Sequence, residues 1–541
     1  MRKQTKLVAV LAAAALLAIG ATMTSFAATG WAEEDGTWVY YDSDGIKVSD
    51  EWKKSGNNWF YLDEDGYLAT DALIEDDGNY YYVGADGAMV SNQWIAIENE
   101  DAGDDDEPAQ WWYYFQANGK AYKASDSATT ASWKVINGKK YVFDDEARML
   151  FGWIDDAGAR VTGDTAWQDG VYYAGDENDG AQTVGWKYLD ILDEAWDPAA
   201  EVNGELFDND QTRWFSFRAN GKKLTDTEKS INGKKYRFDE YGRMIPEWFS
   251  TASTPSQSDD WYYYGDPEDG ARVTKGWFKV VPDYFLKPAA DTKNDDYADG
   301  NASWYYSGSD GKLVKATFKT INGKKYLFNE GGKMQSGLKA VLTDAAGDVV
   351  GIKGIDYVNV ADYPSDPLKT LEGLVQAGYS IYYFGGGEDG SQKTGRQTAS
   401  IDGDDYTFTF TKSGSDKGKG LTKVEDNKVY YGGLLQTAGT DDKYVVVFTG
   451  TVNATVSEAT KKSISKFVDA YGDRTQPVAS GKKIVYEPTA GIGSDPILAG
   501  DQYYVINTAG TIIKSKSKAK DGDEYIVVVE NSEIKQIYQE Y

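Results

Sequence analysis

Cysteine and histidine are both absent from the 541 residues of the chain. Their absence excludes disulfides, a thiolate nucleophile and a Ser-His-Asp triad, and it removes the usual ligands of zinc and copper. Carboxylate chemistry and oxygen-ligated calcium remain available. We therefore expect no cofactor, no catalytic residues and no transition-metal site.

Positive charge is also scarce, with 56 Lys and Arg against 86 Asp and Glu and a formal net charge of -30. Such a chain lacks the basic surface that binds a phosphate backbone, so no nucleic-acid partner is expected. Aromatic residues are abundant instead, with 17 Trp, 40 Tyr and 19 Phe, unlike in disordered acidic chains. An acidic folded surface is compatible with cationic head groups or neutral sugars.

Long apolar runs are missing except at the N-terminus. Arg2, Lys3 and Lys6 precede an apolar run over residues 7–20, and Ala27 ends a small-residue cleavage site. This pattern predicts a signal peptide over residues 1–27, because the run is shorter than the roughly 20 residues that span a bilayer. We expect a secreted protein with no transmembrane segment after signal cleavage.

An aromatic motif repeats after the signal peptide. It covers residues 38–45, 59–66 and 80–87, each beginning with Trp or Tyr and ending in Asp-Gly. Alternating aromatics beside Asp-Gly predict β-hairpins, with an aromatic strand, a tight turn and a short second strand such as residues 67–70. Asp42, Asp44 and Asp63 are interpreted as turn-forming residues, because the further oxygen ligands of a calcium loop are missing.

A second motif, Ile-Asn-Gly-Lys-Lys-Tyr, occurs at residues 136–141, 231–236 and 321–326. An aromatic hairpin precedes each copy and a Gly-Asp-rich turn follows it, which indicates a cassette of three hairpins. The fold class is therefore predicted as all-β, a β-hairpin solenoid of tandem aromatic-rich repeats with polar loop insertions. The insertions are expected at residues 98–110, 197–212, 282–301 and 343–378.

The pattern weakens after residue 440. Residues 445–448 and 525–529 indicate strands, and residues 457–471 place Ile464, Phe467, Val468 and Tyr471 on one helical face. The expected divisions are a signal peptide (1–27), a first hairpin array (28–126), a repeat cassette (127–280), a further cassette (281–440), and degenerate repeats or a C-terminal cap (441–541).

The repeats resemble the choline-binding or cell-wall-binding repeats of Gram-positive surface proteins. The segment from Gly30 and Trp31 to Gly45, with Trp38 and Tyr40 inside it, carries this resemblance, and residues 230–244 and 320–337 are similar to glucan-binding repeats. The resemblance covers most of residues 30–433. It implies a β-hairpin solenoid attached to a cell-wall polymer, such as choline-bearing teichoic acid or another glycan, or to extracellular glucan.

Aromatic side chains two apart on a strand share a face, and stacked hairpins can gather them around a groove. Such a cage suits a quaternary ammonium or the apolar face of a sugar. The resemblance adds the Trp of each Gly-Trp pair or its equivalent. Many of these rings can equally be solenoid core. In the Asn-Gly-Lys-Lys-Tyr hairpins the paired positions hold Lys140 and Val142 or Lys325 and Leu327, so these interfaces are interpreted as structural or suited to glucan. The candidate ligand-binding residues are Trp31, Trp38, Tyr40, Trp52, Trp59, Tyr61, Tyr80, Tyr82, Trp94, Trp112, Tyr114, Trp153, Trp186, Trp261, Tyr263, Trp277, Trp304 and Tyr306.

The sequence thus favours a secreted, non-catalytic protein of the cell surface or cell wall that binds glycan through aromatic cages. Two alternatives remain open. One is a cell-wall or glucan hydrolase with a carboxylate active site, because two acids suffice for glycoside hydrolysis. The other is a surface adhesin.

Overall fold

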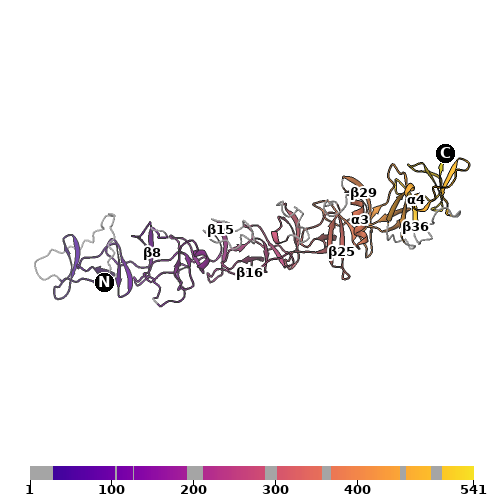
Figure 1. Ribbon diagram of the computed structural model, residues 1–541. Helices are drawn as coiled ribbons and strands as arrows, with labels where there is room; N and C mark the ends of the chain where they lie inside the picture. The colour runs from indigo at the N-terminus through magenta and orange to yellow at the C-terminus, as the bar shows by residue number, and fades with distance from the viewer. Residues whose placement is uncertain are drawn as a thin grey trace. The chain divides into compact units, whose positions relative to one another are not determined.

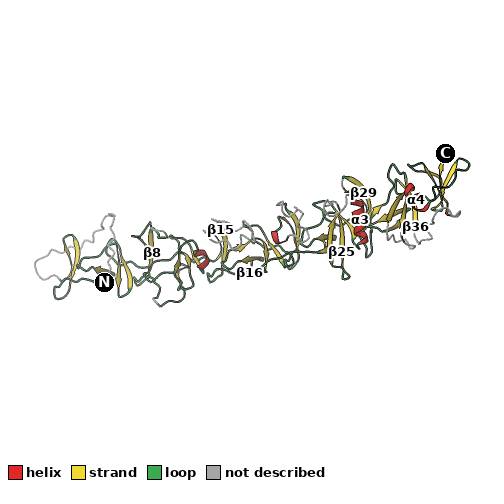
Figure 2. Ribbon diagram, in the orientation of Figure 1, coloured by secondary structure: helices red, strands yellow, loops and turns green. Residues whose placement is uncertain are grey.

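The computed structural model describes residues 29–103, 106–125, 127–191, 211–286, 301–355, 367–401, 403–450, 459–488 and 502–541. Strands dominate the described residues, and helices are few and short (Figure 2). The expected signal peptide, residues 1–27, lies outside the described residues. Contacts divide the chain into two compact units, Met1–Glu247 with Tyr264–Arg272, and Trp248–Tyr263 with Val273–Tyr541.

The first unit is a series of short antiparallel sheets, coloured from indigo to magenta in Figure 1. Most are two-stranded hairpins of consecutive strands, while β11 lies between β12 and β13, and β17 lies between β16 and β18. The elements are β1 (Gly30–Glu34), β2 (Thr37–Tyr41), β3 (Glu51–Ser55), β4 (Asn58–Leu62), β5 (Ala72–Asp76), β6 (Asn79–Val83), β7 (Gln93–Glu98), β8 (Gln110–Phe115), β9 (Lys134–Ile136), β10 (Lys139–Tyr141), β11 (Gly152–Ile154), β12 (Arg160–Val161), α1 (Ala166–Asp169), β13 (Tyr172–Ala174), β14 (Gly185–Ile191), β15 (Gln211–Phe217), β16 (Thr227–Ile231), β17 (Lys234–Phe238) and β18 (Met244–Ile245).

Two-residue turns with positive φ join the strands of several hairpins. Asn137 and Gly138, between β9 and β10, have φ of 49° and 82°, the left-handed conformation that a type I′ hairpin turn needs at both positions. The aromatic strand pairs mainly with the strand that precedes it, and the segment after it makes only isolated bridges such as Leu62↔Leu68. The expected pairing across the Asp-Gly turn was therefore incomplete: the Asp63 carboxylate accepts hydrogen bonds from two turn amides and closes a tight loop there instead.

One backbone hydrogen bond ties each of the first hairpins to the next. The amide of Leu68, after the second hairpin, donates to the carbonyl of Trp38 at 2.8 Å, and the amide of Met89 donates to that of Trp59 at 2.8 Å. The Met89 side chain also lies against Gly119 in the turn after β8, where an added Cβ would be 2.4 Å from the sulfur. Successive hairpins thus interlock through both backbone and side chains.

The second unit begins with hairpins of the same kind and ends in larger sheets. β25 lies between β26 and β27, and the later sheets have the orders β28-β29-β32-β31-β30, β34-β33-β36 and β35-β39-β38-β37. The elements are β19 (Glu247–Ser250) and β20 (Trp261–Tyr264), whose outer residues Glu247 and Tyr264 belong to the first unit, then β21 (Gly276–Val280), the 3-10 helix η2 (Tyr284–Leu286), β22 (Ser303–Ser307), β23 (Thr317–Ile321), β24 (Lys324–Phe328), β25 (Gly337–Thr343), β26 (Val349–Gly354), α3 (Pro367–Gln376), β27 (Ser380–Phe384), β28 (Gly395–Ile401), β29 (Asp404–Phe410), β30 (Lys423–Glu425), β31 (Lys428–Tyr431), β32 (Leu434–Leu435), β33 (Tyr444–Thr449), β34 (Ala459–Ser463), α4 (Ile464–Tyr471), β35 (Lys482–Tyr486), β36 (Gln502–Asn507), β37 (Lys516–Lys520), β38 (Tyr525–Glu530) and β39 (Glu533–Glu540).

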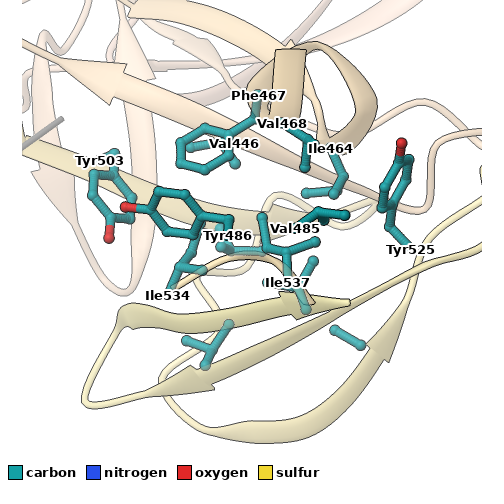
Figure 3. Close-up of a cluster of buried hydrophobic side chains, with 14 of the residues drawn as sticks. Val446, Ile464, Phe467, Val468, Val485, Tyr486, Tyr503, Tyr525, Ile534 and Ile537 are labelled. Carbon is teal, nitrogen blue, oxygen red and sulfur yellow. The ribbon is translucent and has the colours of Figure 1, made fainter. Parts of the chain in front are cut away.

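The C-terminal sheets enclose an apolar core beneath α4 (Figure 3). Ile464, Phe467 and Val468 are buried on one face of this helix, as the sequence pattern predicts. The helix is shorter than expected, because Ala459–Ser463 forms strand β34 and the Ser463 hydroxyl caps the helix by accepting from the amide of Lys466 at 3.3 Å.

The insertion expected as a loop over residues 343–378 instead contains β26 and α3 in its described part. Residues 197–210, most of another expected insertion, lie outside the described residues. Within the described ranges, no helix is long and apolar enough to cross a membrane.

Candidate functional site

A tryptophan of one hairpin contacts a ring opposite it on the same hairpin and a ring of the next hairpin. In the first such group, the Trp31 ring lies 5.3 Å from Tyr40, its cross-strand partner, and 5.5 Å from Phe60 of the following hairpin. Both contacts are edge-to-face, the geometry that aromatic quadrupoles favour. We call such a group an aromatic trio, and its third ring the closing ring.

The same geometry recurs along both units. Trp52 lies 5.1 Å from Tyr61 and 5.2 Å from the closing ring Tyr81. Four further tryptophans are arranged in the same way with their own partners. These trios are Trp94 with Tyr114 and Tyr141, Trp153 with Tyr173 and Phe215, Trp248 with Tyr263 and Tyr305, and Trp277 with Tyr306 and Tyr326.

Trp186 departs from this pattern, because its cross-strand partner is Ser216. The Trp214 ring, 6.0 Å from the Trp186 ring, stands where the other groups have the cross-strand ring. The Tyr236 ring of the next hairpin lies 4.8 Å from the Trp186 ring.

The 18 sequence-predicted residues differ in how accessible they are. Trp59 is 41% exposed and Trp261 is 2% exposed, so the two indoles lie at opposite extremes. The Trp261 indole N–H donates to the carbonyl of Ser256 at 2.8 Å, as a core tryptophan does. Four more are buried, namely Tyr61, Trp153, Tyr263 and Tyr306. The remaining twelve are partly buried, namely Trp31, Trp38, Tyr40, Trp52, Tyr80, Tyr82, Trp94, Trp112, Tyr114, Trp186, Trp277 and Trp304.

Two trio tryptophans carry an indole N–H without an acceptor. The Nε1 atoms of Trp31 and Trp52 are inaccessible, and among the described residues none accepts a hydrogen bond from them. Trp112, which is outside the trios, has the same property. An unsatisfied buried donor costs about 1 to 3 kcal/mol, so these donors lower the stability of the interfaces that hold them.

Trp153 and Tyr173 of one trio line a cavity of about 470 Å³ in the first unit, within the size range of small-ligand sites. Tyr188 at its rim is 50% exposed and lies 4.8 Å from Trp214. Its charged lining residues are Asp106, Arg160, Asp164, Lys187 and Asp190.

Two lysine ammonium groups, those of Lys187 and Lys223, lie close to aromatic rings at or near this cavity. The Lys187 ammonium lies 5.9 Å over the Tyr173 ring. Beneath the cavity, the ammonium of Lys223 donates to the carbonyl of Trp167 at 2.5 Å, and burial lowers the pKa of Lys223 to about 8. Apolar ring faces beside carboxylates and ammonium groups form a lining that can stack on a sugar and hydrogen-bond its hydroxyls.

A polar network surrounds one outer ring in the second unit. The Trp304 indole N–H donates to Glu388 at 2.6 Å, and Lys279 binds the other carboxylate oxygen at 2.7 Å. These hydrogen bonds, with that from Lys279 the stronger influence, lower the pKa of the Glu388 carboxyl below its ordinary value. An ionised carboxylate is thus held beside Trp304, whose ring lies 6.3 Å from that of Trp277.

Sequence reasoning missed the closing rings. Phe60 and Tyr81 lie between the paired positions on their strands, so the period-two rule assigns them to the other face, which the structure brings against the preceding tryptophan. Tyr141 and Tyr326, assigned to interfaces without aromatic pairs, contact Trp94 and Trp277, both at 4.9 Å. Phe60, Tyr81, Tyr141 and Tyr326 are each the third residue of the second strand of a hairpin. An aromatic residue at that place is the signal that would have found them.

Comparison with known families identifies the repeats. Residues 48–94 match the Choline-binding repeat family, and residues 317–334 match the family described as putative cell wall binding repeat. Among curated proteins, a 254-residue stretch is 26% identical to Glucosyltransferase-S of Streptococcus mutans serotype c. It covers 42% of this chain and 16% of that relative, so the match spans about one sixth of the relative's length.

Similar solved structures come from Streptococcus pneumoniae. Choline binding protein F is 20% identical, with 68% of this chain and 98% of that chain covered and a TM-score of 0.36. The modular autolysin LytC, solved with a synthetic peptidoglycan ligand, is 20% identical, with 58% and 55% covered and a TM-score of 0.30.

Proposed function

Because the chain carries choline-binding and cell-wall-binding repeats, we propose that it is a secreted protein that binds cell-wall polymer or extracellular glucan without catalysing a reaction. Its place is the cell surface, reached through the signal peptide of residues 1–27. The repeats form a β-hairpin solenoid, divided into a first array (28–126), two cassettes (127–280 and 281–440) and a C-terminal cap (441–541).

The recurring trio is the observation that carries this proposal. The same three-ring contact appears at six interfaces of the described residues. Aromatic rings gathered in this way match the apolar C–H groups of a sugar or a quaternary ammonium. The acidic net charge disfavours nucleic acid as the partner.

Repetition explains how weak sites can hold the chain to a polymer. Each ring contact with a cation or sugar contributes modestly, about 0.5 to 2 kcal/mol for a quaternary ammonium. Several sites that engage one polymer can raise retention by about 100 to 10,000-fold through effective concentration. We therefore expect attachment to fail gradually as sites are removed.

Sedimentation with purified cell walls and with insoluble glucan tests the proposal. The chain should sediment with at least one polymer, and free choline or soluble dextran should release it. Trp52→Leu removes the central ring of the second trio, so it should reduce retention, whereas Trp111→Leu, in a buried cluster outside the trios, should not. Failure to sediment with either polymer would refute the proposal.

A further inference from the structure

The residue opposite the closing ring differs between otherwise similar trios. Phe60, which closes the first trio, has Lys53 as its cross-strand partner. Tyr81, which closes the second, has Ile74. This position lies directly across the hairpin from the closing ring, so its charge acts on any ligand that stacks against that ring.

Lys53 directs its ammonium at the first trio. Its Nζ atom lies 5.3 Å over the Tyr40 ring and 2.8 Å from the Glu51 carboxylate, and its side chain is only 21% exposed. The ring face that would attract a ligand cation therefore already carries a cation of the protein. A quaternary ammonium entering there would meet a like charge at short range.

Lysine recurs at this position in other trios. Lys187, the partner of the closing ring Phe215, lies over Tyr173 at the 470 Å³ cavity. The further cases among the trios are Lys134 opposite Tyr141 and Lys319 opposite Tyr326. The Trp186 group, although it lacks the cross-strand ring, has Lys229 opposite Tyr236. In the Trp248 trio the position holds Phe278, whose ring stacks on Tyr263 at 4.6 Å and fills the space.

The second trio has an uncharged residue opposite its closing ring. Ile74 is buried and brings no charge, and the Tyr61 hydroxyl lies 3.4 Å from the Asp50 carboxylate, which favours a cation. Lys54 lies 5.9 Å over Trp59, which is not one of the three rings of this trio.

We propose that the residue opposite the closing ring selects the ligand class: lysine dedicates a trio to neutral sugar, and Ile74 makes the second trio a quaternary-ammonium site. A neutral sugar stacks on the rings and accepts hydrogen bonds from the lysine ammonium, so the charge that repels choline helps to hold it. This inference rests on the proposed binding function and assigns its two ligand classes to different interfaces of one chain.

We call the residue opposite the closing ring the selector. Exchanging the residue types at positions 53 and 74 tests its role. The full-length secreted chain is prepared as wild type, as Ile74→Lys and as Lys53→Ile, with Ile74→Val and Lys53→Arg as matched controls that keep the character of each position. Equilibrium dialysis with radiolabelled choline and retention on immobilised dextran give a choline-to-dextran ratio for each protein. Circular dichroism confirms that every variant is folded.

We expect Ile74→Lys to lower choline binding by about 2- to 30-fold, the value of one lost ring–cation contact, and Lys53→Ile to raise the number of bound choline molecules. The controls should retain the wild-type ratio. A ratio that does not move, or that moves in the same direction in both exchanged variants, overturns the selector. Wild-type chain that sediments with walls but binds no choline overturns it too, whereas loss of all polymer sedimentation refutes the proposed function itself.

Discussion

Two turn glycines with nearly identical backbones provide a measure of how tightly the hairpins interlock. Gly119 has φ of +81° and lies under the Met89 side chain, where a new Cβ would be 2.4 Å from the sulfur. Gly138 has φ of +82° and nothing within 4 Å of the position that its Cβ would take. Substitution by alanine therefore imposes the same backbone strain at both sites but a clash at only one.

The expected costs follow from these surroundings. The left-handed conformation costs a residue with a Cβ about 1 to 2 kcal/mol, which is the whole effect for Gly138→Ala. Gly119→Ala adds the displacement of Met89 from the packed interface, about 1 to 3 kcal/mol for overpacking. The total for Gly119→Ala is then about 2 to 5 kcal/mol.

Urea unfolding followed by tryptophan fluorescence, with both variants repeated in a Met89→Ala background, separates the two effects. In that background Gly119→Ala should cost no more than Gly138→Ala, because the side chain that obstructs the Cβ has been removed. Equal costs for the two glycines in the native background would refute the interlocking, as would an excess that persists after Met89→Ala.

Three further outcomes are expected. Trp59→Ala should reduce retention on cell walls with an unchanged far-ultraviolet spectrum. Trp261→Ala should instead cost about 3 to 5 kcal/mol of stability, because that ring is 2% exposed. Unfolding by Trp59→Ala, with retention lost only in a folded Trp261→Ala, would contradict the site. Burial raises the pKa of Asp283 to about 6 from its ordinary value of 3.8, so its contribution to folding is favourable at acid pH and is lost as pH rises from about 4 to 6. Asp283→Asn should remove this part of the pH profile of thermal unfolding. Purified protein should release no reducing sugar from peptidoglycan or α-glucan, and a release that one carboxylate substitution abolishes would reveal an active site.

The hairpins were predictable because their signals are local. Asn137 and Gly138 mark a turn by their tolerance of positive φ, and the aromatic alternation in residues 59–62 marks a strand. The secondary structure is mostly β, as expected. The strand partner was less evident, because an Asp-Gly turn after the aromatic strand reads as a hairpin although the longer pairing is with the strand before it.

Only part of the candidate site could be predicted from the sequence, because a trio depends both on the alternation of residues along a strand and on how one hairpin packs on the next. Trp52 and Tyr61 share a face by the alternation within one hairpin, and the sequence indicates both. Tyr81 joins them through the rotation from one hairpin to the next, which alternation within a strand does not encode. Residues 343–378 were misread for a related reason, since α3 in an insertion has no counterpart in the repeat.

The tie between successive hairpins uses main-chain atoms, the Leu68 amide and the Trp38 carbonyl in the first case. Any side chain except proline preserves that bond, so a duplicated repeat can diverge at its rings while it stays docked to its neighbours. A substitution can then change the ligand preference of one interface without separating the hairpins. Single substitutions such as the difference between Lys53 and Ile74 can thus convert an array of identical sites into one that binds several polymers.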